Sequence, residues 1–495
     1  MKRFNVTGLC VPTEDYMVDI SDKVEKIAEL VHRRCYFTIN RARQYGKTTT
    51  LNCLRDALKN EYIVIFTSFE GLEDECFESS ETFCRALVSL IVKALRYSTA
   101  TQGYIDQWKN QDINGFQSLS EHISNMCVDQ KVVLIIDEVD KSSNNRVFLH
   151  FLGMLREKFL ARKAGMDSTF HSVILAGVYD IKNIKLKMIN DGVYTLASGE
   201  GQLQNSPWNI AESFNVDMSF SPDDISTMLI EYEHDHNTAM DMKAIASEIF
   251  YYTNGYPYLV SKICKIISEN LNDNWTPSGI RKSVEIILNE KNTLFDDLIK
   301  NLEGNNSLYN LIYDILIVGK KITFSYSNPI IDLCAIYGIL VDDGNFSRIS
   351  NRIYEIFLCN YFISKDTTNP KNNLKIGMVS GINSISHNDI IVNNRFNMEL
   401  CLIKFADHYK EIYNDTDLSF LERQSRLLFL TYLKPLINGH GFYHIESQFT
   451  DQRRMDIVLD YGIEQFIIEL KIWHGDKYKQ DAYNQLLGYL STKNL

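Results

Sequence analysis

The chain lacks any pairing pattern among its cysteines. Ten cysteines are spread singly over 495 residues, without a Cys-x-x-Cys pair and without the His/Cys spacing of a zinc site. This arrangement argues against a disulfide framework and a structural zinc ion, and favours buried thiols in a reducing compartment. No run of about 18 apolar residues occurs, and the N-terminus lacks the apolar core of a signal peptide. We therefore expect a cytoplasmic protein with no membrane partner.

The chain also lacks an excess of positive charge. Its formal net charge is -12, which argues against a general attraction to nucleic acid but leaves room for a local basic groove. No internal repeat or low-complexity tract is present. Hydrophobic residues make up 45% of the chain and charged residues 23%, as in folded globular proteins. The length predicts roughly three or four domains.

Residues 26–215 alternate between helical and strand-like stretches, as a parallel α/β sheet requires. The predicted strands are short and apolar, and amphipathic segments such as Ser80–Leu95 and Arg146–Phe159 separate them. The four strands are predicted at Cys35–Ile39, Tyr62–Thr67, Val132–Ile136 and Ser172–Ala176. This order is typical of a nucleotide-binding sheet, which we assign to residues 1–215.

The strand pattern stops near residue 216. Ser221, followed by Pro222 and two acids, predicts the start of a helix. Helical periodicity then continues to about residue 300, with a turn at Thr253–Tyr258 where Gly and Pro interrupt it. We expect a helical lid over residues 216–300.

Two apolar helices and a hairpin follow over residues 301–363. Asp343-Gly344 lies between two short strand-like runs, as in a tight hairpin. Helix, helix and hairpin is the order of a winged helix. The next stretch, Ser364–Leu374, is rich in Asn, Lys and Thr with one Pro, which indicates a linker. We therefore place a linker at 364–395 and a further domain at 396–495.

Two motifs in the first domain predict a phosphate-binding site. The segment from Arg41 to Thr48 ends in Gly-Lys-Thr, follows a strand and opens a helix, which is the context of a P-loop. Helix-start amides would face phosphates, Lys47 would neutralise the β- and γ-phosphate oxygens, and Thr48 would hold magnesium. The residues expected to bind nucleotide are Arg43, Gln44, Tyr45, Gly46, Lys47, Thr48, Thr49 and Asp137.

The second motif is an apolar strand that ends in Asp137 and Glu138. It would bring Asp137 to the magnesium ion and Glu138 to the attacking water. Taken alone, the tripeptide also suits an ordinary surface loop, and the strand suits a buried strand with solvated acids. Together the two motifs favour a site that binds ATP and magnesium. Arg41 departs from the usual P-loop pattern, which has its first glycine there.

With that departure, the loop resembles the "predicted AAA-ATPase" family, whose loop usually reads Arg-Pro-Arg-Arg-Phe-Gly-Lys-Ser/Thr. Further stretches match the habits of the family: Tyr16-Met-Val-Asp19, Ile174–Tyr179 and Asn254-Gly255-Tyr256. The resemblance implies a P-loop ATPase core and a γ-phosphate sensor on the strand at 172–178. It identifies no sensor residue and no arginine finger, and it leaves assembly into a homo-oligomer open.

Near the C-terminus, two carboxylates and a lysine are expected to converge. Glu469 and Lys471 share one face of a predicted strand because side chains in a strand repeat with period two. If the preceding strand pairs with it as a hairpin, Asp456 reaches the same face. Phosphodiester hydrolysis uses carboxylates to hold magnesium and a cation beside the attacking water. Glu-x-Lys alone also suits an ordinary exposed strand, where opposite charges often alternate.

This set resembles the PD-(D/E)XK nuclease superfamily, which is often fused behind the ATPase family named above. Met455 stands where the superfamily usually has a proline, while Gln485 and Tyr489 match its Gln-x-x-x-Tyr element. Glu422 has two interpretations: the acid on the first helix of the superfamily, or part of a capping box with Ser419. The resemblance implies catalytic Asp456, Glu469 and Lys471, with Glu422, Gln485 and Tyr489 in support.

Two observations speak against nuclease activity. Residues 376–495 carry 12 Lys and Arg against 15 Asp and Glu, so only local clusters such as Arg453/Arg454 could form a basic groove. The sequence also stops at Leu495, where the superfamily adds one more strand, so the domain is expected to be incomplete or cut short. Two functions therefore stay open: an ATP-dependent enzyme acting on nucleic acid, and a nucleotide-dependent switch with an inactive docking domain.

Overall fold

The chain divides into two compact units in the computed structural model. Unit 1 comprises residues 1–283 with 336–338, and unit 2 comprises residues 284–335 and 339–495. The residues that the structure describes are 2–109, 113–142, 146–178, 208–368, 390–393, 395–412, 418–437, 441–446, 456–462 and 464–468.

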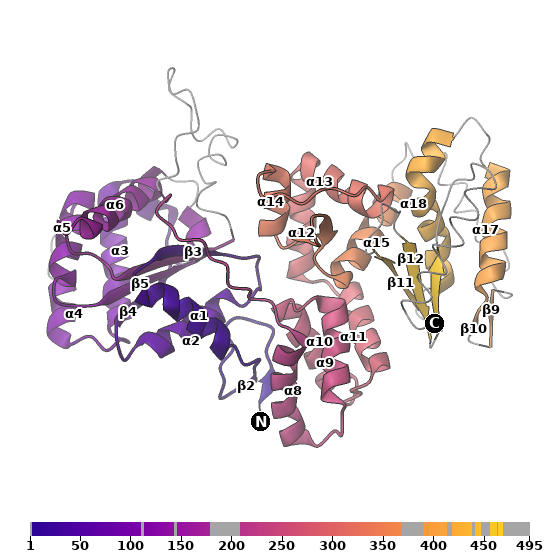
Figure 1. Ribbon diagram of the computed structural model, residues 1–495, viewed down its shortest axis with the longest axis horizontal. Coiled ribbons are helices and arrows are strands. Elements are labelled where there is room, and N and C mark those ends of the chain that lie inside the picture. The colour runs from indigo at the N-terminus through magenta and orange to yellow at the C-terminus, as the bar shows by residue number, and fades with distance from the viewer. Residues whose placement is uncertain are drawn as a thin grey trace. The chain divides into compact units, whose positions relative to one another are not determined.

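Unit 1 contains a four-stranded parallel sheet with the order β3-β6-β5-β4 (Figure 1). Each strand lies within one residue of its predicted bounds, which confirms the α/β prediction. An isolated parallel bridge from Phe37 to Glu212 adds a further contact to the β3 edge. The strands are β3 (Tyr36–Asn40), β4 (Ile63–Ser68), β5 (Val132–Asp137) and β6 (Ser172–Gly177).

Helices cover both faces of this sheet because alternate strand side chains are buried on opposite faces. Tyr36, Leu134 and Leu175 join the core cluster formed with α3, α5 and α6, whereas Phe37 and Ile135 are equally buried but lie outside that cluster. The helices are α1 (Ser21–His32), α2 (Lys47–Leu58), α3 (Ser80–Leu95), α4 (Gln102–Lys109), α5 (Phe116–Cys127) and α6 (Arg146–Lys163), with short η1 (Asp74–Phe77) and η2 (Val139–Ser142).

The predicted lid is helical. Ser221 caps α8 in a capping box with Asp224, and the turn between α9 and α10 contains Gly255 at φ 72°. A Cβ there would lie 2.1 Å from the carbonyl oxygen of Phe220, so only glycine suits this close approach. The lid helices are α8 (Pro222–His236), α9 (Met242–Thr253), α10 (Pro257–Asn270) and α11 (Pro277–Asn289), and the boundary between the two units falls within α11.

The N-terminal segment packs on the lid. Strands β1 (Arg3–Phe4) and β2 (Asp15–Tyr16) pair in parallel. Phe4 lies 5.1 Å from Tyr16 and 5.0 Å from Tyr232 of α8 between ring centroids. The Tyr16 hydroxyl donates to Asp235 at 2.9 Å. Residues before α1 are therefore fixed to the lid helices rather than to the sheet.

The first part of unit 2 follows the predicted order of helices and a hairpin. Strands β7 and β8 pair antiparallel around Asp343-Gly344. Helix α15 continues to Thr368, so the segment assigned to the linker begins inside a helix. The elements are α12 (Thr293–Glu303), α13 (Asn306–Tyr313), the π-helix η4 (Asp314–Val318), α14 (Pro329–Ile336), β7 (Leu340–Asp342), β8 (Ser347–Ile349) and α15 (Arg352–Thr368).

The C-terminal part of unit 2 has an antiparallel sheet with the order β11-β12-β13. Arg426 of α18 is 8% exposed and donates to the carbonyls of Leu316 and Ile317 in η4 at 3.2 and 3.3 Å. Tyr443 of β11 donates to Asn360 of α15 at 2.9 Å. The elements are β9 (Ile391–Val392), β10 (Arg395–Phe396), α17 (Met398–Ile412), α18 (Leu418–Ile437), β11 (Gly441–Glu446), β12 (Asp456–Tyr461) and β13 (Glu464–Ile468).

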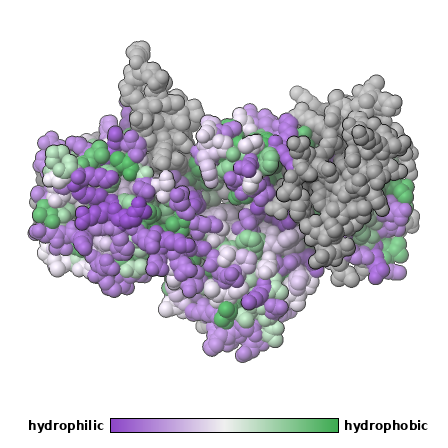
Figure 2. Space-filling view, viewed as in Figure 1, coloured by the Kyte–Doolittle hydropathy of each residue, from purple (hydrophilic) through white to green (hydrophobic). Residues whose placement is uncertain are grey.

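The surface of the described residues is mostly hydrophilic on the face that Figure 2 shows, with apolar residues in small groups. None of the helices in these residues combines the length and the apolar character needed to cross a bilayer.

Candidate nucleotide site

The loop between β3 and α2 has the turn geometry of a phosphate-binding loop. Gln44 has φ 57° and Gly46 has φ 76°, and Gly46 is the N-cap of α2. The first backbone amides of α2 have no partners within the helix and present a positive end at this position. Gly46 suits the left-handed conformation because it has no Cβ. The predicted strand, loop and helix are therefore confirmed.

Lys47 is the first residue of α2, and its side chain is 5% exposed. Its ammonium donates to the carbonyl oxygens of Arg41 and Ala42 at 3.0 and 3.1 Å. Burial lowers the pKa of Lys47, and the carboxylates of Glu138 and Asp137 oppose that shift. The ammonium is thus held inside the loop, close to Asp137 at the end of β5 and to Glu138 just after it.

Thr48 and Asp137 are in direct contact. The Thr48 hydroxyl donates a 2.7 Å hydrogen bond to Oδ2 of Asp137, and Oδ1 of Asp137 accepts from the amide of Glu138 at 2.9 Å. Asp137 is 3% exposed. A hydroxyl and a carboxylate at the mouth of a P-loop are oxygen ligands of the kind that magnesium prefers. This pair fits the predicted magnesium ligands.

Glu138 follows β5 in a left-handed conformation, with φ 52°. A non-glycine residue with positive φ is uncommon and turns its side chain out of the strand direction. Burial raises the pKa of Glu138, while Lys47 opposes the shift. A half-buried carboxylate of raised pKa suits a proton acceptor.

Asp140 is a site residue that the sequence did not single out. Its Oδ2 accepts from the amide of Val178, just after β6. A Cβ on Gly177 would lie 2.6 Å from Oδ1 of Asp140, so glycine leaves room for this carboxylate. The signal in the sequence is an acid two residues after Glu138, combined with a glycine at the end of the next strand. Asp140 joins the ends of β5 and β6.

Arg41 occupies the position of the missing glycine, and its side chain contacts Asn40, Val216 and Phe214. Its guanidinium donates to the carbonyls of Asn40 and Val216 at 2.9 and 3.0 Å and lies 5.4 Å from the centre of the Phe214 ring. An arginine in place of the glycine therefore has a structural role: its side chain bonds the loop to the start of the lid region.

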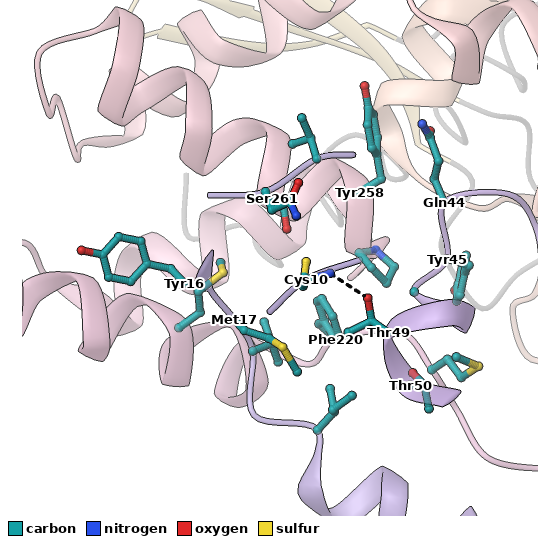
Figure 3. A pocket seen from close by; sticks show the side chains of 18 of the residues that line it. Cys10, Tyr16, Met17, Gln44, Tyr45, Thr49, Thr50, Phe220, Tyr258 and Ser261 are labelled. Atoms are coloured by element: carbon teal, nitrogen blue, oxygen red, sulfur yellow. Dashed lines mark hydrogen bonds between the residues drawn. The ribbon is translucent and has the colours of Figure 1, made fainter. Parts of the chain in front are cut away.

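A pocket of about 300 Å³ adjoins the start of α2 (Figure 3). The P-loop side contributes Gln44, Tyr45 and Thr49 to its lining. Cys10 and Phe220 lie near Thr49, and the Cys10 amide donates to its hydroxyl at 3.3 Å. Further lining comes from the N-terminal segment and from the lid, including Met17, Met218, Pro257, Tyr258 and Ser261. The cavity is mostly apolar with a few polar groups at its edge.

Arg43 is exposed, and its carbonyl oxygen accepts a hydrogen bond from the hydroxyl of Tyr256 in the lid at 2.6 Å. The rings of Tyr45 and Tyr256 meet edge to face at 4.8 Å between centroids. The loop and the lid are therefore bonded through both backbone and side chains.

The predicted C-terminal site is described only in part. Asp456 begins β12 and pairs with Glu446, and β12 pairs antiparallel with β13 as far as Ile457 and Ile468. Glu422 lies in α18, which begins at Leu418, so Ser419 is inside that helix rather than before it as a capping box requires. The remaining residues lie outside the described ones: Glu469, Lys471, Gln485 and Tyr489. Within the described ranges, no three His, Cys, Asp or Glu side chains form a metal-binding cluster.

Comparison with known proteins adds a family to this geometry. A family model described as an AAA-like domain matches residues 14–359. The chain belongs to the AAA-like domain family. The match covers the sheet, the P-loop and the lid, so the AAA-like chain is a P-loop protein of the ATPase type. No curated protein matches it.

Solved structures similar to this AAA-like chain include a Walker-type ATPase and two ORC proteins. A Walker-type ATPase of Pyrococcus abyssi is 12% identical with a TM-score of 0.48, and the match covers 72% of this chain and 99% of that one. The ORC2 protein of Aeropyrum pernix, solved with ADPNP and ADP, is 13% identical with a TM-score of 0.35, over 70% and 92%. The ORC1 protein of Aeropyrum pernix, solved with DNA, is 11% identical with a TM-score of 0.32, over 70% and 94%.

Proposed function

We propose that this chain binds ATP with magnesium and hydrolyses it. The observation that carries the proposal is the contact between Thr48 and Asp137 beside the buried Lys47 and Glu138, at the carboxyl edge of a parallel sheet. Ligands of open α/β sheets bind at that edge. Magnesium would be held by Thr48 and Asp137, and it would neutralise phosphate charge.

The other residues of the site have distinct roles in this proposal. Lys47 binds the β- and γ-phosphate oxygens. When it does so, its ammonium gives up its hydrogen bonds to the carbonyl oxygens of Arg41 and Ala42. Glu138 orients the attacking water and accepts a proton from it. The raised pKa of the Glu138 carboxylate makes it a better proton acceptor. The pocket between the N-terminal segment, Tyr45 and the lid receives the nucleoside, because a flat apolar base fits a cavity of about 300 Å³.

The test is ATP binding and turnover by Lys47→Ala. Removing the buried cation should abolish hydrolysis and weaken ATP binding by about tenfold or more. Lys59→Ala is the matched control, because Lys59 is exposed at the other end of α2. Equal turnover by both variants and the wild type would refute the phosphate site.

We further propose that unit 2 acts on nucleic acid through Asp456, Glu469 and Lys471 in a magnesium-dependent, nuclease-like site. The antiparallel pairing of β12 with β13 supports it, because the described register ends at Ile457 and Ile468, next in sequence to Asp456 and Glu469. Binding and hydrolysis of ATP in unit 1 would control the access of nucleic acid to this site. Arg453 and Arg454 are the local basic cluster available for a phosphate backbone.

A second candidate is a nucleotide-dependent switch that assembles with protein partners, including copies of itself, and whose C-terminal region only docks. The buried Arg426 and the Tyr443–Asn360 bond favour it, since they seat the C-terminal elements on η4 and α15. Magnesium-dependent cleavage of linear DNA or RNA separates the two functions. Cleavage by the wild type that is lost in Lys471→Ala and kept in Lys477→Ala would establish the nuclease, and no cleavage in any of them would favour the switch.

A further inference from the structure

Unit 1 has a second pocket, of about 320 Å³, that shares no residue with the nucleotide site. Its lining comes from residues just before β3, β5 and β6 and from the C-terminal ends of α5 and α6 with the residues that follow them. It therefore lies at the amino edge of the sheet, opposite the P-loop. Strands of five and six residues separate the two edges by about 16–20 Å at about 3.3 Å per residue. A ligand here would be distinct from the bound nucleotide.

Cationic side chains converge on this pocket. Arg34, Lys131 and Arg162 line it, and all three act electrostatically on His171, which also lines it. Arg162 is already engaged: its guanidinium donates to the carbonyls of Phe170, His171 and Arg34. It therefore serves as a fixed cation in the wall of the pocket.

Arg34 and Lys131 are exposed, and their side-chain N–H groups can donate hydrogen bonds to a ligand. Neither side chain makes a hydrogen bond or ion pair with another residue in the part of the chain that the structure describes. The Lys131 ammonium lies 6.0 Å from the centre of the Tyr62 ring. Arg34 is held in a left-handed conformation with φ 60°, and its carbonyl oxygen is fixed by Arg162 at 3.0 Å. The backbone that carries Arg34 is thus positioned in advance.

The acidic groups of the pocket do not cancel this charge. Asp167 is engaged by the Lys158 ammonium at 2.7 Å and by the Ser124 hydroxyl at 2.6 Å. Burial raises the pKa of Asp167, but these hydrogen bonds outweigh burial and hold its pKa below the ordinary value. Asp129 is the other lining acid and is exposed. With Lys158 counted against Asp167, three cations face one free carboxylate.

His171 adds a buried polar atom that has no partner. Its Nε2 is inaccessible and makes no hydrogen bond within the described residues. Burial lowers the pKa of His171 to about 4, with further contributions from Arg34, Arg162 and Lys131. The imidazole is therefore neutral at physiological pH and adds no charge of its own to the pocket.

We propose that this amino-edge pocket binds the phosphate group of a small phosphorylated molecule. Arg34 and Lys131 supply charge-assisted hydrogen bonds, and Arg162 supplies a fixed positive field. A half-open cavity of about 320 Å³ suits a compact ligand, whereas a phosphate backbone needs an extended basic surface.

Inorganic phosphate is the probe, and the full-length chain carries Lys47→Ala so that the P-loop contributes little to phosphate binding. Phosphate at constant ionic strength should raise the Tm of this protein by linkage, and the concentration dependence gives Kd. Adding Arg34→Ala or Lys131→Ala should weaken phosphate binding by about tenfold. The matched control is Arg33→Ala, because Arg33 is the exposed neighbour of Arg34 and pairs with Glu212 at 3.8 Å, outside the pocket.

A Tm response that survives Arg33→Ala and disappears in Arg34→Ala and Lys131→Ala supports the proposal, provided the Tm values without phosphate show that all variants fold. An equal response in every variant, or none in the Lys47→Ala chain, overturns it. A parallel titration with a short DNA duplex distinguishes the source: stabilisation by the duplex but not by phosphate, lost in Arg34→Ala, would overturn it in favour of a nucleic-acid surface.

Discussion

The hydroxyl of Tyr256, in the turn that opens α10, donates a 2.6 Å hydrogen bond to the main-chain carbonyl of Arg43 in the P-loop. Tyr45 packs edge to face on the same ring. Because Gly255 alone permits the close approach of this turn to Phe220, the lid reaches the P-loop through a fixed backbone. Tyr256 therefore links the conformation of the loop to the position of the lid.

Tyr256→Phe tests this link. The phenylalanine keeps the ring packing against Tyr45 and removes only the hydrogen bond, which is worth about 0.5–1.5 kcal/mol. We expect ATP affinity to fall by roughly two- to tenfold, with a smaller change in kcat, measured by titration with a fluorescent ATP analogue. Tyr97→Phe is the control, since Tyr97 is 86% exposed. If Tyr256→Phe binds ATP as the wild type does, the lid does not hold the loop in its binding conformation.

Glu138→Gln should separate ATP binding from hydrolysis. Asp137 and Thr48 remain, so ATP and magnesium still bind, while the loss of the proton acceptor should lower kcat by about 10² or more. Because burial raises the pKa of Glu138, the acid limb of the wild-type rate profile should lie above the pH at which an ordinary carboxyl titrates. The rate falls as pH falls through that raised pKa, since the base becomes protonated.

The stability of the same variant provides a second measurement. A carboxyl whose folded pKa is raised opposes folding when ionised, and this cost fades as pH falls through the folded pKa. Glu138→Gln removes the cost, so its Tm at pH 7 should equal or exceed that of the wild type, and the difference should shrink at lower pH. A variant that loses stability and ATP binding together would identify Glu138 as a structural acid.

Arg41→Gly restores the usual P-loop glycine but should nevertheless lower the stability of the folded protein. The substitution removes two hydrogen bonds, to Asn40 and Val216, and the contact with the Phe214 ring. We expect a loss of about 2 kcal/mol in the free energy of unfolding, from the lost bonds and the added chain entropy of glycine. Urea unfolding measures it, with Arg43→Gly as the comparison. Unchanged stability in Arg41→Gly would make the departure from the pattern incidental.

The sheet and the phosphate site could be predicted from sequence because their signals are local. Four apolar strands and a Gly-Lys-Thr tripeptide after the first of them are visible in short windows, and β3 to β6 lie within one residue of the expected positions. Lys47 and Asp137 can be expected close together because parallel strands bring their carboxyl ends to one edge. The start of α8 at Ser221 was likewise predictable from its capping residues.

Other features depend on contacts between distant segments, which no local pattern contains. Arg41 looks like a defect in the loop until Val216, 175 residues later, is seen to accept its hydrogen bond. Asp140 has no role in a motif until Val178 lies beside it. The continuation of α15 to Thr368 has no clear local signal, because polar residues that suit a linker are also tolerated on the exposed face of a helix.

The last prediction concerns the C-terminal carboxylates. If Asp456 and Glu469 converge, they repel each other without metal, and magnesium or manganese relieves the repulsion. Metal should then raise the Tm of unit 2 in the full-length chain by linkage. Asp456→Asn and Glu469→Gln should each remove this response, and neither should destabilise the metal-free protein.

Glu464→Gln is the matched control, because Glu464 lies at the other end of the β12–β13 hairpin, opposite Tyr461. All proteins are compared without ATP at the same magnesium concentration, so that the contribution of Thr48 and Asp137 is common to them. A metal response of equal size in the wild type and all three variants would show that Asp456 and Glu469 are ordinary charges on a solvated strand. A response lost in Asp456→Asn and Glu469→Gln but kept in Glu464→Gln would establish a metal site before any substrate is known.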